Sequence, residues 1–265
     1  MSKFANNRLM LKLVLLCCLV GFNSQAAIIL LEDFEDNNLT FSASDGLFFD
    51  TGRDLFTISP LNGVASPIDG AYNGFNGENF FAADDIDDPQ GPGIRSQTLT
   101  FNLNISGFNN LLFSGLFGAG GNNLNGNDST ARYDSADGLR VRAQIDGGTI
   151  QDLLFFEAEQ PGGDVTNNRL LQDTNFDGIG DGLLLSTSLT AFNNIAINGL
   201  GSSLSLFIEI HGDAQSESFA FDDITIAGER ISTPPPTDIP TPSSLPLFCF
   251  AIVLTLSNVV CNKRA

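Results

Sequence analysis

The chain has 265 residues, and 12 Lys and Arg against 31 Asp and Glu give it a net charge of −19 at pH 7. So acidic a protein repels phosphate backbones, which excludes nucleic acid as a partner. All four cysteines (Cys17, Cys18, Cys249 and Cys261) lie in the terminal segments, so the body of the chain has neither a disulfide nor thiol chemistry.

The first 26 residues predict a secretory signal peptide. Three basic residues and no acid precede the apolar run 13–20, and a polar stretch then ends at the small residue Ala26. An N-terminal membrane anchor is the alternative, but the run is shorter than the ~20 apolar residues that span a bilayer. We therefore expect the mature chain to begin at Ala27.

The segment 27–230 has the period-two alternation of half-buried strands, most clearly over 98–105, 139–145 and 204–210. Further strands are predicted over 28–31, 55–58, 79–82, 111–117, 150–156, 183–189, 191–197 and 219–226. No stretch has a sustained helical period. The sequence therefore predicts one all-β domain, a jelly-roll β-sandwich, with a core supplied by 19 of the 23 phenylalanines.

One segment between the strands and the charge of the whole body of the chain also carry information. The Gly- and Asn-rich segment 118–134 has little to bury and predicts a loop. The segment 27–244 contains seven arginines, no lysine and all 31 acids, so its charge is 7 − 31 = −24. Such a field attracts cations, although acids that only keep the protein soluble are the alternative.

The segment Asp173–Gly182 has the spacing of a calcium-binding loop. Oxygen side chains stand at positions one, three, five and nine, with a glycine at six and a backbone carbonyl at seven. These residues are Asp173, Asn175, Asp177, Asp181, Gly178 and Ile179. Leu184 replaces the glutamate that an EF-hand needs at position twelve, so the loop resembles the thrombospondin type 3 kind instead. A polar turn without an ion is the alternative.

A second candidate calcium site joins the two ends of the domain. The apolar parity of 219–221 is opposite to that of 224–226, so the alternation slips at Asp222 and Asp223. This slip predicts a β-bulge that re-aims a carboxylate. Asp223 and Glu35, which follows the first strand, are the predicted ligands. Acidic residues that only discourage strand pairing are the alternative.

These terminal segments resemble those of galactose-binding-like jelly rolls and carbohydrate-binding modules. In those families a first-strand acid and a last-strand Asp pair hold a structural calcium ion. Together with the loop Asp173–Gly182, the segment 217–224 also resembles a sandwich module of exported proteins from aquatic bacteria. The resemblance implies a fold and a structural calcium ion, and no particular activity.

Sugar-binding and catalytic residues are sparse in this sequence. The chain has no Trp and two Tyr, and Tyr72 in the turn 71–77 is the best candidate for stacking on a sugar. A turn-packing role for Tyr72 is the alternative. His211 is the only histidine, and no nucleophile elbow, paired-histidine metal site or phosphate loop is present. We therefore expect no enzymatic activity.

The C-terminal segment combines a Pro-, Thr- and Ser-rich linker over 231–244 with an apolar helix and basic tail over 245–265. This order of parts resembles the PEP-CTERM sorting signal, with Pro240, Thr241 and Pro242 in place of Pro-Glu-Pro. The resemblance implies an exosortase-type enzyme as partner and a membrane association only before sorting. A plain tail anchor is the alternative.

The function predicted from these features is that of a structural or adhesive protein. It is exported to the cell surface or an extracellular polysaccharide matrix, and calcium stabilises its sandwich. A carbohydrate-binding module for extracellular polysaccharide is the first alternative. A glycoside-active enzyme is the second, because 31 acids always offer a pair of carboxylates.

Overall fold

The computed structural model describes residues 26–36, 38–49, 54–60, 68, 71–86, 96–120, 133–160, 168–212 and 217–231. The chain divides into two compact units, Met1–Arg230 and Ile231–Ala265, and every strand below belongs to the first. Within the described ranges there is no helix with the length and apolar character to cross a membrane. The predicted signal peptide up to residue 25, and the linker and tail from residue 232 on, lie outside these ranges.

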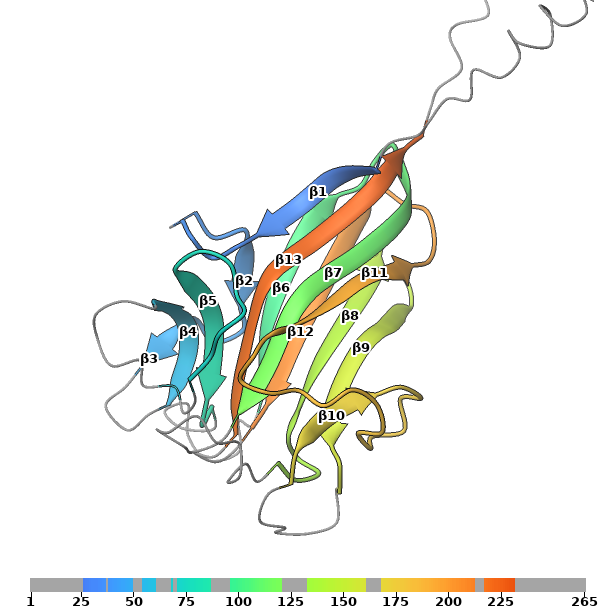
Figure 1. Ribbon diagram of the computed structural model, residues 1–265. Coiled ribbons are helices and arrows are strands. Elements are labelled where there is room, and N and C mark those ends of the chain that lie inside the picture. The colour runs from blue at the N-terminus through green and yellow to red at the C-terminus, as the bar shows by residue number, and fades with distance from the viewer. Residues whose placement is uncertain are drawn as a thin grey trace, which may run out of the picture. The chain divides into compact units, whose positions relative to one another are not determined.

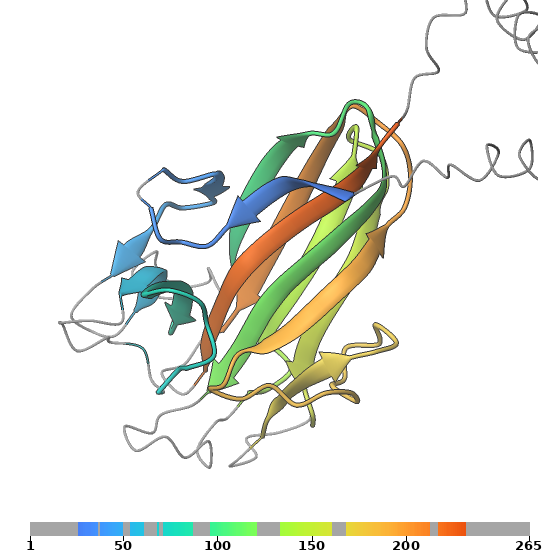
Figure 2. The same ribbon diagram turned by 45° about the horizontal axis from the view of Figure 1, so that its top comes forward.

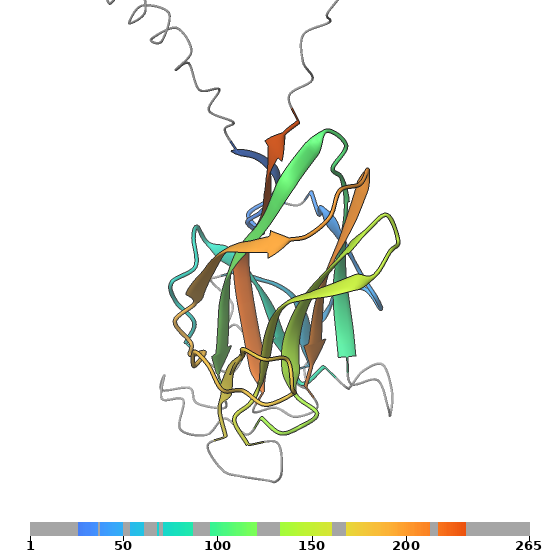
Figure 3. The ribbon, with the colours of Figure 1, turned by 90° about the vertical axis from the view of Figure 1, so that its right-hand side faces the viewer.

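The first unit is a sandwich of two antiparallel β-sheets, which Figure 3 shows from the side as two layers. This arrangement confirms the prediction of an all-β sandwich. The seven-stranded sheet has the order β11-β7-β13-β5-β4-β3, with β1 also paired to β13 (Figure 1). Its strands are β1 (Ala26–Glu32), β3 (Phe48–Phe49), β4 (Leu55–Pro60), β5 (Asn79–Asp84), β7 (Phe108–Gly120), β11 (Thr190–Ile197) and β13 (Ser218–Arg230).

The six-stranded sheet has the order β10-β9-β8-β12-β6-β2. Its strands are β2 (Phe41–Ala43), β6 (Ser96–Asn104), β8 (Gly138–Ile145), β9 (Ile150–Ala158), β10 (Leu170–Asp173) and β12 (Ser203–His211). The three segments with the clearest alternation, now β6, β8 and β12, are neighbours in this sheet. Their apolar residues face the core, because one face of each strand is covered by the other sheet.

Strand β13 lies in the middle of the seven-stranded sheet and pairs with β7 along one edge. Its other edge is shared, because β1 pairs with its C-terminal part and β5 with Phe219–Phe221 (Figure 2). The β13–β7 register shifts between Asp222 and Thr225, and Asp223 has a φ of 52°. The predicted bulge in the last strand is therefore confirmed.

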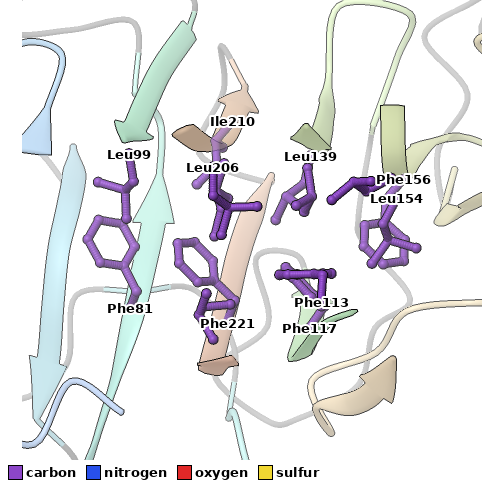
Figure 4. Packing of buried hydrophobic residues seen from close by; sticks show 14 of the residues in the cluster. Phe81, Leu99, Phe113, Phe117, Leu139, Leu154, Phe156, Leu206, Ile210 and Phe221 are labelled. Carbon is purple, nitrogen blue, oxygen red and sulfur yellow. The ribbon is translucent and has the colours of Figure 1, made fainter. Parts of the chain in front are cut away.

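Aromatic side chains fill the space between the sheets. Figure 4 shows two facing rows, with Phe81, Phe113 and Phe221 from the seven-stranded sheet opposite residues such as Leu206 from the other. Phe81 and Phe221 are stacked, with ring centroids 4.8 Å apart and planes 21° apart. Burying one Phe side chain stabilises the fold by about 1.5–3 kcal/mol, so these rings contribute much of the stability of the core.

Two of the predicted elements are wrong. The segment 183–189 is not a strand and makes only isolated bridges at Leu184 and Ser188. The Oγ of Ser186 accepts the Ser188 N–H at 3.2 Å, and such local side-chain bonds compete with a strand ladder.

The predicted loop 118–134 begins too early, because β7 continues through Gly120. A Cβ on Gly118 would lie 2.9 Å from the Ser186 carbonyl oxygen, and one on Gly120 would lie 2.7 Å from Thr187 Cγ2. These two glycines therefore allow close packing inside a strand. The loop residues 121–132 lie outside the described residues.

Candidate functional site: the polar face and two acidic sites

The outer side of the six-stranded sheet carries polar side chains beside two phenylalanines. On β12, Leu206, Ile208 and Ile210 are fully buried, so the residues between them face away from the core. β8 alternates in the same way, and the β8–β9 register places Phe155, which is itself buried, opposite Arg140. We name this surface the polar face and define it by Arg140, Arg142, Phe155, Phe207, Glu209 and His211.

The strand register places Phe207 at the centre of the polar face. It lies opposite Arg142 of β8 on one side and Thr100 of β6 on the other. The next outward residue of β12, Glu209, lies opposite Arg140 and Thr98. Phe207 and both arginines are half-buried, so an aromatic ring is flanked by planar polar groups that solvent can reach.

Ion pairs and aromatic contacts hold both arginines in place. Arg142 Nη1 lies 2.9 Å from Glu209 Oε2, and its Nε lies 3.2 Å from Asp152 Oδ1. Arg140 Nε donates a 2.6 Å hydrogen bond to Glu157 Oε1. The guanidinium carbons of Arg140 and Arg142 lie 5.4 and 5.1 Å from the ring centroid of Phe155. Cation–π contact and pairing therefore orient the two guanidinium planes.

Burial and neighbouring charges shift three pKa values on or beside the polar face. Burial lowers the pKa of Arg140, but the hydrogen bond and charge of Glu157 outweigh it and leave the pKa above its usual value. Burial raises the pKa of Glu157, against the opposing effect of Arg140. Burial and then the two arginine charges lower the pKa of His211 to about 4. His211 is therefore neutral at pH 7.

The predicted calcium loop Asp173–Gly182 folds around the carboxylate of Asp173. Asp173 Oδ1 accepts the N–H groups of Asn175 and Asp177 at 3.2 and 3.3 Å, and its Oδ2 accepts that of Gly178 at 2.8 Å. Asp181 Oδ1 accepts both the N–H and the hydroxyl of Thr174. The backbone bond from Thr174, followed by its hydroxyl bond, lowers the pKa of Asp181. Loop N–H groups therefore fix the orientation of the carboxylates that were predicted to bind an ion.

The second acidic site lies where the turn before β5 contacts the bulge of β13. Glu35 Oε1 accepts the N–H groups of Glu78 and Asn79, both at 2.7 Å. A Cβ on Gly77 would lie 2.3 Å from the same oxygen, so glycine is needed for this approach. The side-chain amide of Asn76 donates to Asp223. Glu35 and Asp223 are thus both held by the segment 76–79.

Asp222 adds a group to this site that the predicted ligand set did not include. It is fully buried, its Oδ2 accepts the Asn76 N–H at 2.9 Å, and its Oδ1 has no hydrogen-bond partner. Burial, with smaller contributions from Asp223 and Glu35, raises the pKa of Asp222 to about 7. A buried carboxylate oxygen without a partner costs free energy unless a proton or a cation satisfies it.

The metal-binding predictions stay predictions. Within the described ranges, no group of three or more His, Cys, Asp or Glu side chains is arranged to hold a metal ion. Of the two candidate sites, only the one around Glu35 and Asp223 contains an orphaned buried oxygen, that of Asp222. In the loop, both oxygens of Asp173 accept backbone N–H groups, but Oδ2 accepts only one and keeps a further lone pair with which it could bind an ion.

Tyr72, the predicted sugar-stacking residue, is buried in a small second cluster and is only 8% exposed. Its ring packs against Phe80, and its hydroxyl lies 2.9 Å from the Ser218 carbonyl oxygen and 2.8 Å from Ser218 Oγ. Neither ring face is open to a ligand. The structure thus places Tyr72 in the packing role that was its alternative, because the turn 71–77 folds over the sheet.

The residues of the polar face were not predicted as a site. The alternation of 139–145 and 204–210 did put Arg140, Arg142 and Glu209 on the polar side of their strands. It did not show that these two strands are neighbours, since pairing between distant segments leaves no local signal. The predicted sorting residues Pro240, Thr241 and Pro242 lie outside the described residues.

No protein-family model and no curated protein matches this chain. Solved structures with a similar arrangement include TmCBM61 in complex with β-1,4-galactotriose, at 11% identity and a TM-score of 0.38, covering 75% of this chain and 95% of that one. The CBM22-1 xylan-binding domain of Paenibacillus barcinonensis Xyn10C has 13% identity and a TM-score of 0.37, covering 80% and 99%. A cyclase from Fischerella sp. TAU has 16% identity and a TM-score of 0.42, covering 79% and 100%.

Proposed function

We propose that this chain is an exported, non-catalytic module that binds extracellular polysaccharide through the polar face. The observation that carries the proposal is the half-buried ring of Phe207, flanked in register by Arg142 and Thr100 on an outer sheet face. Sugars are recognised by an aromatic ring under their C–H face and by planar polar groups that bond neighbouring hydroxyls. The polar face offers both, so this alternative now precedes a purely structural or adhesive role.

The charges on and beside the polar face favour a neutral glycan. Two arginines are paired with the carboxylates of Asp152, Glu157 and Glu209, and His211 is uncharged at pH 7. Among the described residues of the polar face, every arginine is thus paired, which leaves none free for an acidic sugar. The domain around this face is strongly acidic, which further repels anionic polysaccharides. The expected ligand is therefore a neutral polysaccharide chain.

The remaining parts of the proposal concern topology, ions and location. We propose that the sandwich is a jelly roll and that calcium stabilises it. Export through the signal peptide and sorting by an exosortase-type enzyme would place it at the cell surface or in the matrix. N-terminal sequencing and mass spectrometry of the extracellular protein test this location. A mature form that starts at Ala27 and lacks 247–260 supports it, and one that retains 247–260 indicates a plain tail anchor.

Calorimetric titration with xylan and β-1,4-galactan oligosaccharides tests the binding function, with polygalacturonate as the anionic comparison. We expect Phe207→Ala to weaken binding of the neutral probe by at least about tenfold, or about 1.4 kcal/mol, because the ring supplies the stacking surface. Phe49→Ala is the matched control, since Phe49 is an exposed phenylalanine on β3 of the other sheet.

Three results would contradict this proposal. Equal affinities of Phe207→Ala and the wild-type protein would show that the polar face does not bind the glycan. Preference for polygalacturonate would contradict the charge argument. Release of reducing sugar from any probe would indicate a glycoside-active enzyme instead of a binding module.

A further inference from the structure

The exposed aromatic ring of Phe176 lies beside the polar face and is not explained by the core. Phe176 is 45% exposed, although an aromatic side chain normally gains most of its free energy from burial. Its backbone has a φ of 60°, in the left-handed region that bulky residues rarely adopt. Backbone strain of this kind concentrates at binding sites, where a particular side-chain direction is required.

Phe176 is connected to the polar face through Phe155. Their ring centroids are 5.0 Å apart and their planes lie 88° apart, so the two rings meet edge to face. Phe155 in turn lies beneath the guanidinium groups of Arg140 and Arg142. In the β9–β10 ladder Asp173 lies directly opposite Phe155, so the loop Asp173–Gly182 leaves the sheet beside the polar face.

The loop fixes the position of this ring before any ligand arrives. Asp173 is buried, and its carboxylate accepts N–H groups on both sides of Phe176, from Asn175 and from Asp177. Asn175 Oδ1 also accepts the Asp177 N–H, at 3.0 Å. A rigid aromatic group loses little conformational entropy when a ligand binds, which favours affinity.

We propose that the loop Asp173–Gly182 forms the rim of a glycan-binding surface on the polar face, and that Phe176 stacks on one sugar ring of a neutral polysaccharide. This inference rests on the proposed function and extends it. Phe176 and Phe207 act as two stacking positions, with the guanidinium groups of Arg140 and Arg142 on the same surface for hydroxyl groups. A glycan of several sugar units can contact both rings.

The test compares Phe176→Ala and Phe176→Leu with the wild-type protein, using the same xylan and β-1,4-galactan oligosaccharides in calorimetry. We expect both variants to lose about tenfold in affinity for long oligosaccharides. Phe176→Leu retains an apolar contact with Phe155, so its loss reports the missing ring face and not a disordered loop. Phe49→Ala is again the matched control, because Phe49 is an exposed phenylalanine on β3 of the other sheet. It should bind within twofold of wild type.

A comparison of the single variants Phe207→Ala and Phe176→Leu distinguishes this inference from the proposed function. If Phe207→Ala weakens binding while Phe176→Leu binds like wild type, the loop is not part of the surface and the inference is wrong. If Phe176→Leu weakens binding while Phe207→Ala does not, the stacking role of Phe176 is supported and the central polar face is excluded. A wild-type protein that binds neither probe overturns both.

Discussion

The N–H of Asn76 donates a 2.9 Å hydrogen bond to Oδ2 of Asp222, across 146 residues of sequence. This bond joins the turn before β5 to the bulge in β13 and leaves Asp222 Oδ1 buried without a partner. The bulge therefore holds a carboxyl group whose pKa is about 7. Its protonation state can change near neutral pH, which gives stability a measurable pH dependence.

Asp222→Asn should change the dependence of stability on pH. Because the folded-state pKa is raised from its usual 3.8 to about 7, the stability that Asp222 contributes is fully present below pH 4. It is lost as the pH rises to 7. Asparagine keeps an acceptor for the Asn76 N–H and never ionises. In melting curves from pH 4.5 to 8, the variant should therefore gain stability relative to wild type as the pH rises.

His211 has the opposite pH dependence, since its lowered pKa of about 4 makes stability fall as the pH drops from 6.5 to 4. Both proteins contain His211, so its contribution cancels in the comparison. Parallel melting curves for the wild type and Asp222→Asn would contradict the pKa shift of Asp222.

Calcium should raise the melting temperature of the wild-type protein. Calcium at one hundred times its dissociation constant adds about 2.7 kcal/mol to the free energy of unfolding. For a domain of this size that corresponds to roughly 5–10 °C, at ~2–4 °C per kcal/mol. Sodium chloride at matched ionic strength should not reproduce the shift, because screening does not fix oxygens around an ion. Differential scanning calorimetry with and without chelator measures it.

Two variants assign any calcium shift to a site. Asp177→Ala removes a predicted ligand of the loop, and Asp222→Asn removes the buried anionic oxygen near Glu35 and Asp223. Since that oxygen has no partner, we expect Asp222→Asn to reduce the shift more than Asp177→Ala does. A melting curve that chelator leaves unchanged would mean that both predicted ion sites are wrong.

Tyr72→Phe should lower stability without changing glycan affinity. It removes the hydroxyl that bonds Ser218 and keeps the ring that packs on Phe80. The expected loss is about 1 kcal/mol, because the Ser218 carbonyl still accepts a bond from the Tyr133 hydroxyl. Tyr72→Ala also leaves a cavity and should cost about 3–5 kcal/mol. Urea denaturation measures both, and reduced glycan affinity in Tyr72→Phe would contradict the packing role.

The sequence by itself determined the local structure of the sandwich. Alternation placed β6, β8 and β12 and put Arg142 and Glu209 on the polar side of their strands, because a strand exposes every second residue. The parity change at Asp222 and Asp223 predicted the bulge for the same reason. These features depend on a residue's near neighbours, so the amino-acid order contains them.

Only the tertiary structure decided which residues meet. The sequence left Tyr72 as a candidate for solvent exposure, but in the structure the Tyr72 hydroxyl bonds Ser218 and its ring is buried. The sequence also placed Gly120 in a loop, whereas the structure pairs it with Ser218 in the β7–β13 ladder. The ion pair of Arg142 with Glu209 and the contact of Phe176 with Phe155 likewise depend on which strands pair. Such pairings are set by the burial of the whole core and by hydrogen bonding between distant strands, which no local pattern records.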